Sequence, residues 1–594
     1  YRFRARPFDL VSTPSVAEHD ACGAAIRVDH RRGKVMRRLA GNDPEVNEEW
    51  ITDKDRFAFT YAREDDRLTH PLVRDRQEDG GTGELRVASW PEAFAVAARG
   101  LAEAGTAVGV LTGGRLTAED AYAYSKFARH TLGTNNIDFR ARALSQEEAD
   151  FLAAQVVLAA PGNGGVTYAE VEQARSVVLV ALEPEDEAGT LFLRLRKANR
   201  ELRTPIWSVG AFTSRGLRKM GGTLLPAVPG EEVEVVSRLA ESPDVAIDSG
   251  GVILVGERAV EVPGLLAAVT TLARTTGAKL AWVPRRAGDR GALETGCLPT
   301  LLPGGRPVAD AAARVDVASA WGSESLPSET GLDTEQLLAA AAGGDLQALV
   351  IGGVDPADLP AETLATALEN TFVVSLELRS SQVTEAADVV FPVALAAEKA
   401  GSFVNWEGRV RPFEKVFDNP HALPDVRVLA GISEETDRPL GFRTTDRAAH
   451  EMRELGPWEG TRSTSVAAAD PAAADGSRRG EGPLVLASWK QLIDDGRMQD
   501  GEDHLRATGR RAVVLVNEQT LAGLGVAPGD HVELTGPAGS LRLPVGVADL
   551  VDGVVWAPAT GPGPSVRRHV GPAGCRVSLA AVARSLDAAE GETK

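Results

Sequence analysis

The succession of apolar and polar positions along the chain predicts an α/β protein. Continuous apolar runs such as TAVGVLTGG (106–114), SVVLVAL (176–182) and GGVILVGE (250–257) are typical of strands buried on both faces. Amphipathic segments follow them, and LTAEDAYAYSKFARHTL is predicted to form a helix entered at Thr117. Because the unit of strand, glycine loop and helix recurs, we expect doubly wound α/β domains.

Changes in this pattern divide the chain into five predicted parts, at residues 1–75, 86–239, 247–436, 437–481 and 482–594. The first is a small unit rich in charge, and the second and third are the two α/β domains. The fourth is predicted to be a linker, because its Ala-, Ser-, Gly-, Asp- and Pro-rich sequence shows no periodicity. The fifth alternates short β-branched runs with PGD and PAG turns, which predicts a β-barrel.

Charge and cysteine content narrow the classes of function. The formal net charge is −20, which argues against general nucleic-acid binding, because phosphate neutralisation requires a surplus of Lys and Arg. One basic cluster is expected to be a solvated or inter-subunit face; it comprises Arg31, Arg32, Lys34, Arg37 and Arg38. Three cysteines far apart imply no disulfide framework and favour a reducing cytoplasm. No window offers the ~20 apolar residues of a spanning helix, so membrane association is expected only through partners.

The segment from Phe372 to Phe413 concentrates the candidate chemistry. Glu398, Asn405, Glu407 and Arg409 follow two predicted buried strands in a glycine-containing loop. Such loops carry ligand-binding backbone in α/β proteins, because the carboxyl edge of the sheet leaves room there. A hydrogen-bonded junction between domains is the other interpretation, and the residues alone leave both open.

The same passage, ADVVFPVALAAEKAGSFVNWEGRVRPF, resembles the ADVV-P-x(n)-E-x-x-G-(T/S)-x-x-N-x-E-G-R signature of the molybdopterin oxidoreductase superfamily. The sequence of this passage is most similar to that of the large iron–sulfur (G-type) subunit of bacterial respiratory NADH:quinone oxidoreductase. The resemblance covers essentially the whole chain. It implies two doubly wound α/β domains of molybdopterin-oxidoreductase type, a small N-terminal domain and a C-terminal double-psi β-barrel.

The resemblance also indicates what this chain has lost at its N-terminus. The matching region of the superfamily holds a [4Fe–4S] cluster through C-x2-C-x3-C and a fourth cysteine after an N-x-x-W segment. The corresponding positions here are Ala17, Asp20, Ala24 and Thr52, and Cys22 is out of frame. We therefore expect a degenerate cluster domain and no cofactor in this chain. The iron–sulfur clusters of the family are expected in a region missing before Tyr1, and FMN in a partner subunit.

The resemblance predicts that the molybdenum and pterin sites are lost as well. Catalytic relatives bind the metal through a Cys or selenocysteine in NNxD-x-x-AR-x-(C/U), and Leu144 stands at that position. Their phosphate-binding Gly-x-Asn-Pro turn is replaced by the acidic turn from Glu183 to Glu187, where each contact with a phosphate is repulsive by roughly 1–4 kcal/mol. Asp355 begins a second acidic turn. The loop of Glu398, Asn405, Glu407 and Arg409 then becomes a remnant of the cleft that fixes the domains, and neither catalytic residues nor metal ligands are expected.

The function implied by the resemblance is that of a subunit in the hydrophilic arm of respiratory NADH:quinone oxidoreductase, which couples electron transfer from NADH to quinone with ion translocation. This segment is expected to be a non-catalytic scaffold. Its partners would be other hydrophilic-arm subunits on the cytoplasmic side of the bacterial plasma membrane. One alternative is an active molybdopterin-dependent enzyme similar to formate dehydrogenase or nitrate reductase. Another is a nucleotide-binding module at Gly113 or Gly352, which the acidic turns contradict.

Overall fold

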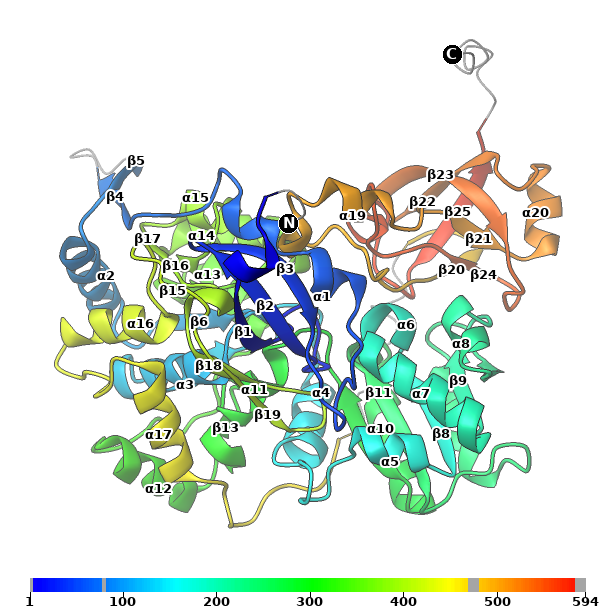
Figure 1. Ribbon diagram of the computed structural model, residues 1–594, viewed down its shortest axis with the longest axis horizontal. Coiled ribbons are helices and arrows are strands. Elements are labelled where there is room, and N and C mark those ends of the chain that lie inside the picture. Colours follow the sequence, from blue (N-terminus) through cyan, green and yellow to red (C-terminus); the bar gives the residue numbers. More distant parts are fainter. Residues whose placement is uncertain (1–3, 77–81, 468–479, 583–594) are drawn as a thin grey trace, which may run out of the picture.

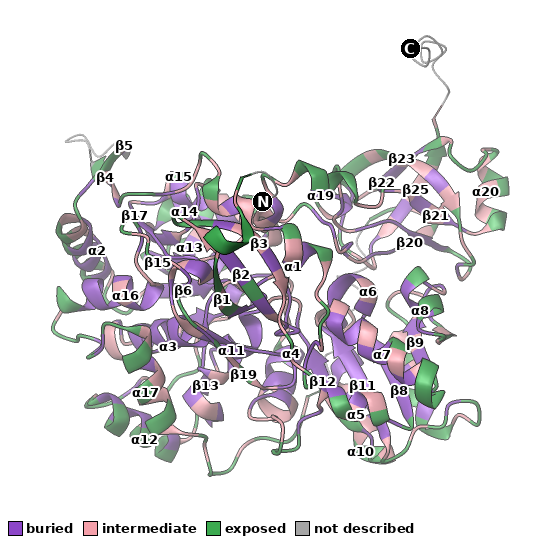
Figure 2. Cartoon of the chain, in the orientation of Figure 1, coloured by how far each residue is buried: buried purple, intermediate pink, exposed green. Residues whose placement is uncertain are grey.

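Two large sheets and a closed barrel organise the chain in the computed structural model, which describes residues 4–76, 82–467 and 480–582 (Figure 1). The α/β class and the C-terminal barrel predicted from the sequence are confirmed. Buried residues follow the strands of both large sheets, while exposed residues lie mainly on the outer helices (Figure 2). None of the described helices has the length and apolar content to cross a bilayer.

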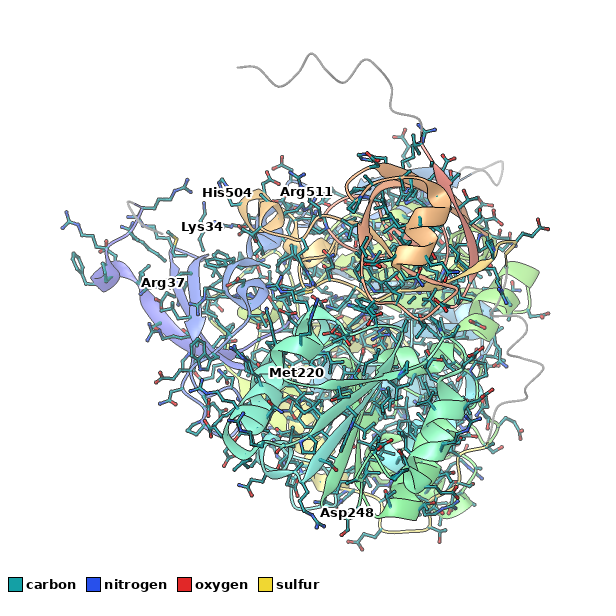
Figure 3. The ribbon with its side chains drawn as sticks, turned by 90° about the vertical axis from the view of Figure 1, so that its right-hand side faces the viewer. Lys34, Arg37, Met220, Asp248, His504 and Arg511 are labelled. Carbon is teal, nitrogen blue, oxygen red and sulfur yellow. The ribbon has the colours of Figure 1, made fainter. Side chains whose placement is uncertain are left out.

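The N-terminal domain is built on a small antiparallel sheet. Strands β1 (Val11–Val16), β2 (Ala25–Arg31) and β3 (Lys34–Ala40) are followed by the short helix α1 (Asp53–Phe57). The β2–β3 hairpin turns through Arg32 and Gly33, whose positive φ angles of 50° and 69° suit the right-handed twist of the strands. Lys34 and Arg37, from the predicted basic cluster, lie along the outer side of this sheet (Figure 3). Arg38 instead turns inward and pairs with Glu18.

The seven-stranded sheet forms the larger α/β domain. Its strand order is β5 (Thr82–Val87), β4 (Leu72–Arg76), β17 (Val389–Pro392), β16 (Phe372–Glu377), β15 (Ala348–Gly352), β6 (Val108–Thr112) and β7 (Ile137–Asp138). The five strands from β17 to β7 are parallel, and both faces are covered by helices. Apolar residues of α2 (Trp90–Ala104), α3 (Ala118–Lys126) and α16 (Asp425–Glu434) pack on one face. Those of α13 (Thr334–Gly343) and α14 (Ala361–Asn370) pack on the other.

The five-stranded sheet is parallel throughout. Its order is β10 (Thr223–Pro226), β9 (Ile206–Gly210), β8 (Ser176–Val180), β11 (Gly251–Gly256) and β12 (Lys279–Val283). Helices α5 (Tyr168–Gln173) and α7 (Gly189–Leu202) cover one face. Helices α9 (Glu232–Arg238) and α10 (Leu265–Thr276) cover the other.

The strand pairing divides the chain differently from the predicted domains 86–239 and 247–436. Strand β6 pairs with β15, which lies far along the chain, so the seven-stranded sheet is interrupted by the whole five-stranded domain. Strands β8 and β11, placed in separate predicted domains, are direct neighbours. The reason is that an apolar run identifies a buried strand without identifying its neighbour in the sheet. The predicted linker 437–481 also contains a helix, α17 (Thr445–Leu455). Residues 468–479, the centre of that predicted linker, lie outside the described residues.

The C-terminal domain closes into a six-stranded barrel. Its order is β20 (Leu484–Ala487), β24 (Val554–Trp556), β21 (Val514–Val516), β23 (Gly539–Val547), β22 (His531–Gly536) and β25 (Arg576–Ala581). In Figure 1 the barrel lies beside the five-stranded domain, above helices α6 and α8. The shorter remaining elements are α4 (Gln146–Phe151), α6 (Pro184–Glu187), α8 (Arg215–Lys219), α11 (Asp289–Glu294), α12 (Ala311–Trp321), α15 (Gln382–Ala386), α19 (Asp503–Ala507), α20 (Glu518–Leu524), α21 (Val566–His569), β13 (Leu301–Leu302), β14 (Arg306–Pro307), β18 (Gly401–Val404) and β19 (Val410–Phe413).

Candidate functional site

The carboxyl ends of three parallel strands face the barrel and form the candidate site. Glu187 follows β8, Glu257 follows β11 and Arg285 follows β12, and all three line one cavity together with Trp489 and Lys490 from the segment after β20. Ligands of open α/β sheets bind at this edge. The cavity, which we call the cleft cavity, measures about 50 Å³, whereas pockets for cofactors and drug-sized ligands measure roughly 300–1,000 Å³.

The acidic turn after β8 directs its carboxylates at other protein groups. Asp186 accepts hydrogen bonds from the Trp489 indole at 3.2 Å and from the Leu492 amide at 3.1 Å, and it pairs with Arg510. Glu187 pairs with Arg258 at 2.9 Å. The turn predicted to repel phosphate therefore holds the barrel domain against the five-stranded domain.

The first residue of this turn, Glu183, has a raised pKa. Burial, with the neighbouring carboxylates of Asp186 and Glu187, raises the pKa of Glu183 to about 8, against a hydrogen bond from Ser214 that lowers it. The side chain thus binds a proton more tightly in the folded chain than in water.

The second acidic turn brings three arginines to one carboxylate. Asp355 begins a single 3-10 turn (Pro356–Asp358) and accepts a hydrogen bond from the Ala357 amide at 3.0 Å. Arg285 and Arg567 lie 3.4 Å and 3.5 Å from Asp358, and Arg286 forms a closer pair with it. Although burial acts to raise the pKa of Asp358, the three guanidinium groups lower it below its usual value.

The position that carries the metal ligand in catalytic relatives is occupied by a hydrocarbon side chain, close in sequence to two buried arginines. Leu144 lies between β7 and α4 and is half-buried. Arg142 just before it pairs with Glu148 at 2.8 Å and with Glu257 at 3.3 Å, and Arg140 pairs with Asp138 at 2.8 Å. Leu144 offers no lone pair to a metal.

The four degenerate cluster positions lie in the N-terminal domain, and each is held by its own local contacts. Ala17 and Ala24 are fully buried. Asp20 accepts a hydrogen bond from the Cys22 amide at 2.8 Å. Thr52 caps α1 by accepting from the Asp55 amide at 3.1 Å.

Two carboxyls and the thiol near these positions, Asp20, Asp55 and Cys22, have pKa values above their usual ones. Burial, followed by the charge of Asp20, raises the pKa of Asp55 to about 7. Burial also raises the pKa of the Cys22 thiol, so the thiolate that a metal binds is disfavoured.

Three of the four residues predicted as a remnant cleft lie together. Asn405 donates hydrogen bonds to Glu407 at 2.8 Å and to the Cys22 carbonyl at 3.3 Å. Glu407 accepts from the Tyr168 amide at 2.9 Å and from Arg409 at 3.1 Å. These contacts join the N-terminal domain to the start of α5.

Glu398 does not join that group. It pairs with Arg67 at 2.8 Å and accepts from Asn419 at 2.9 Å, next to the seven-stranded sheet.

The glycines considered as nucleotide loops are required for close packing. A Cβ atom on Gly113 would lie 1.7 Å from the Gly353 carbonyl oxygen, and one on Gly352 would lie 1.9 Å from the Tyr124 hydroxyl. Both glycines stand at the ends of neighbouring strands, β6 and β15, where two backbones meet.

Sequence reasoning missed two buried charge networks. Lys54 of α1 bonds both oxygens of Asp494 at 3.1 Å and 3.2 Å, and Lys490 lies 3.8 Å from the same carboxylate. Burial and the charge of Lys54 together lower the pKa of Lys490 to about 8. No local pattern predicts this contact, because its partners are 440 residues apart.

The second network includes a residue of the signature itself. Lys399 lies 2.5 Å from Asp120 at the start of α3 and 3.3 Å from Asp425 at the start of α16. Arg115 lies 3.2 Å from Asp425. Lys399 follows Glu398 directly and so belongs to the signature segment. Its ammonium joins the N-terminal ends of α3 and α16.

Comparison with known proteins identifies two family models in the chain. The molybdopterin oxidoreductase family matches residues 67–434, and the NADH-ubiquinone oxidoreductase NDSU1/NuoG-like 4Fe-4S domain matches residues 10–60. The chain is 52% identical to the G-type subunit of NADH-quinone oxidoreductase from Mycobacterium bovis, over 96% of this chain and 71% of that protein. It is 49% identical to the corresponding protein of Streptomyces coelicolor, over 96% and 70%. Acetylene hydratase from Pelobacter acetylenicus has a similar fold, with a TM-score of 0.59 at 13% identity over 92% of both chains.

The second match corrects our expectation about the iron–sulfur region. A 4Fe-4S domain of the family lies within this chain at residues 10–60, so the expectation that the family's clusters are confined to a region missing before Tyr1 is wrong. Asn47, in the N-x-x-W segment, accepts from the Ala25 amide at 2.7 Å and donates to the carbonyls of Ala25, Gly41 and Trp50.

The donor atoms of this domain do not fit a [4Fe–4S] cluster. Such a cluster needs four thiolates, and Cys22 is the one cysteine among residues 10–60. Among the described residues, no group of three or more His, Cys, Asp or Glu side chains is arranged to hold a metal ion. A pterin dinucleotide does not fit either, because the cleft cavity at this edge of the sheet measures only about 50 Å³, against the roughly 300–1,000 Å³ of a cofactor pocket.

Proposed function

We propose, from the premise that the chain belongs to the family of G-type NADH-quinone oxidoreductase subunits within the molybdopterin oxidoreductases, that this part of the subunit is a rigid scaffold. The chain is a subunit of an oxidoreductase complex. Its own α/β domains and barrel hold neighbouring subunits in place and carry out no substrate chemistry. The complex as a whole passes electrons from NADH to quinone.

The observation that carries this proposal is the acidic turn after β8. In a pterin enzyme the amides of that turn would face phosphate oxygens. Here Asp186 faces Trp489, Leu492 and Arg510, and Glu187 faces Arg258. Asp186 therefore ties the five-stranded domain to the barrel domain through an ion pair and two hydrogen bonds, which makes these two domains one rigid unit.

Three finer features belong to the same proposal. The barrel is of the double-psi type, and its supporting observation is a closed ring that contains both parallel and antiparallel strand pairs. The partners are other subunits of the hydrophilic arm, and the chain reaches the membrane only through them. Its place is the cytoplasmic side of the bacterial membrane, which agrees with three buried cysteines that form no disulfide.

Metal analysis of the complex tests the scaffold. The subunit should be purified with its complex from cells that make the molybdenum cofactor, and a molybdopterin enzyme from the same cells should be prepared in parallel as a positive control. The scaffold predicts molybdenum and tungsten at background in the complex and about one metal per chain in the control. One metal per subunit, with a releasable pterin, would establish the molybdopterin enzyme in its place.

A further inference from the structure

One buried lysine in the cleft cavity lacks a hydrogen-bond partner. Lys490 is 7% exposed and lines the cavity, and Asp494, the carboxylate nearest to its ammonium, lies 3.8 Å away. Asp494 is already held by Lys54 and by the Gly496 amide at 3.0 Å, so its oxygens are occupied. Among residues 4–76, 82–467 and 480–582, the Lys490 ammonium makes this one long ion pair and no closer hydrogen bond. An ammonium buried in this way is costly unless something neutralises it.

The other charges around the cavity add to this excess. Of the carboxylates in the wall, Glu187 is paired with Arg258, and Glu257 is paired with Arg142 at 3.3 Å and more distantly with Arg285 at 3.9 Å. Burial raises the pKa of Glu261, the third, and so favours its neutral form. The remaining cations of the wall are Arg285, Arg567 and Lys490, and the first two share Asp358 with Arg286. Positive charge therefore exceeds negative charge on this wall.

The size and access of the cavity select a small ligand. A volume of about 50 Å³ holds roughly four atoms of the size of a water oxygen, since each water needs about 10–15 Å³. Arg285 and Arg567 retain 23% and 29% of their side-chain exposure, so the wall reaches solvent. A nucleotide or a pterin is too large, while a tetrahedral ion with four oxygens matches the space.

We propose that the cleft cavity binds one inorganic phosphate ion, with Lys490, Arg285 and Arg567 as its ligands. The two guanidinium groups present planar N–H donors to phosphate oxygens, and the ammonium supplies a point charge. The ion would join Lys490 on the barrel side and Arg285 on the five-stranded side through charge-assisted hydrogen bonds. This site is separate from the scaffold role, because neither requires the other.

Calorimetric titration of the full chain with sodium phosphate tests the site. Ionic strength is kept constant with sodium chloride, so that general screening is the same throughout. The wild type should bind one phosphate per chain with a saturable isotherm. Lys490→Met and Arg567→Met should each weaken binding at least tenfold. The matched control is Lys34→Met, which removes one positive charge from the outer side of the N-terminal sheet and should leave the affinity unchanged.

Thermal melting separates loss of the site from loss of the fold. Phosphate should raise the melting temperature of the wild type and of Lys34→Met, because it binds the folded chain, and should not raise that of Lys490→Met. If Lys490→Met fails to fold, Arg567→Met carries the test, since its side chain is partly exposed. Equal phosphate affinity in the wild type and the folded variants would overturn the site, and so would the lack of a saturable isotherm. Tighter binding of ADP than of phosphate would also overturn it, because the cavity would then be one end of a nucleotide site.

Discussion

The ammonium of Lys54 lies 3.1 Å from the carboxylate of Asp494, and this contact joins the N-terminal domain to the segment between strands β20 and β21 of the barrel domain. Both side chains are largely buried. Although burial acts to raise the pKa of Asp494, Lys54 and Lys490 lower it to about 2. The Asp494 carboxylate therefore stays ionised in the folded state down to about pH 2.

Lys54→Met should destabilise the chain by about 3 kcal/mol, because removing one partner leaves a buried charge poorly compensated. The melting temperature should fall by several degrees, whereas Lys34→Met should leave it within one degree. Limited proteolysis of the variant should cleave within the barrel domain before the two sheet domains. A melting temperature equal to that of the wild type would contradict a structural role for this pair.

Glu183 should make stability fall as pH rises. Its pKa is about 8 in the folded chain against 4.5 when exposed, so the folded state holds the proton that the unfolded state releases. This stabilisation is fully present below about pH 4.5 and is lost progressively up to about pH 8, on the order of 1 kcal/mol for each pH unit. Between pH 5 and pH 8, the melting temperature should therefore fall less steeply with rising pH in Glu183→Gln than in the wild type. Glu231→Gln, on the exposed start of α9, serves as the control, and an identical slope in Glu183→Gln and wild type would refute the effect.

Gly113→Ala should be strongly destabilising, because its Cβ would lie 1.7 Å from a backbone oxygen that cannot move aside. We expect a loss of about 3 kcal/mol or more, seen as an earlier thermal transition. Gly343→Ala is the matched control: it meets no atom within 4 Å, and as part of a helix it should be neutral or stabilising by up to about 1 kcal/mol. If both substitutions have the same small effect, close packing does not require glycine at position 113. The interpretation of this turn as a nucleotide-binding loop would then be favoured again.

Leu144→Cys should not restore molybdenum binding. The substitution supplies a thiol at the ligand position, while the cleft cavity of about 50 Å³ is still too small for the dinucleotide that carries the metal. Elemental analysis of the variant, expressed in cells that make the cofactor, should give molybdenum at the level of the wild type. Leu144→Ser is the control for the change in size, and a stoichiometric metal in the cysteine variant alone would show that one ligand is sufficient.

The sequence predicted the strands well and their partners poorly. Buried parallel strands such as β8 and β15 appear as continuous apolar runs, so their positions are encoded locally. Their order depends on contacts between distant segments, as when β6 joins β15. The acidic turn at Glu183 could also be predicted, because its four carboxylates lie within five consecutive residues.

The partners of that turn could not be predicted. Trp489 and Arg510 belong to the barrel domain, and nothing in their own surroundings in the sequence indicates that they meet Asp186. In the iron–sulfur domain the sequence identifies the N-x-x-W segment, in which Asn47 binds the Trp50 carbonyl. The absence of the cluster cysteines nevertheless leads to the wrong prediction that the family's clusters lie only before Tyr1.

The interrupted sheet has a consequence for the order of folding during synthesis. The five strands of the smaller sheet are all complete once Val283 has left the ribosome, so that domain can form its core early. Strands β4 to β7 are made before it, but their central neighbours β15, β16 and β17 follow only when Pro392 has emerged. The first strands of the seven-stranded sheet therefore wait with unpaired apolar edges while a complete domain forms behind them, so we expect this sheet to fold more slowly than the five-stranded one.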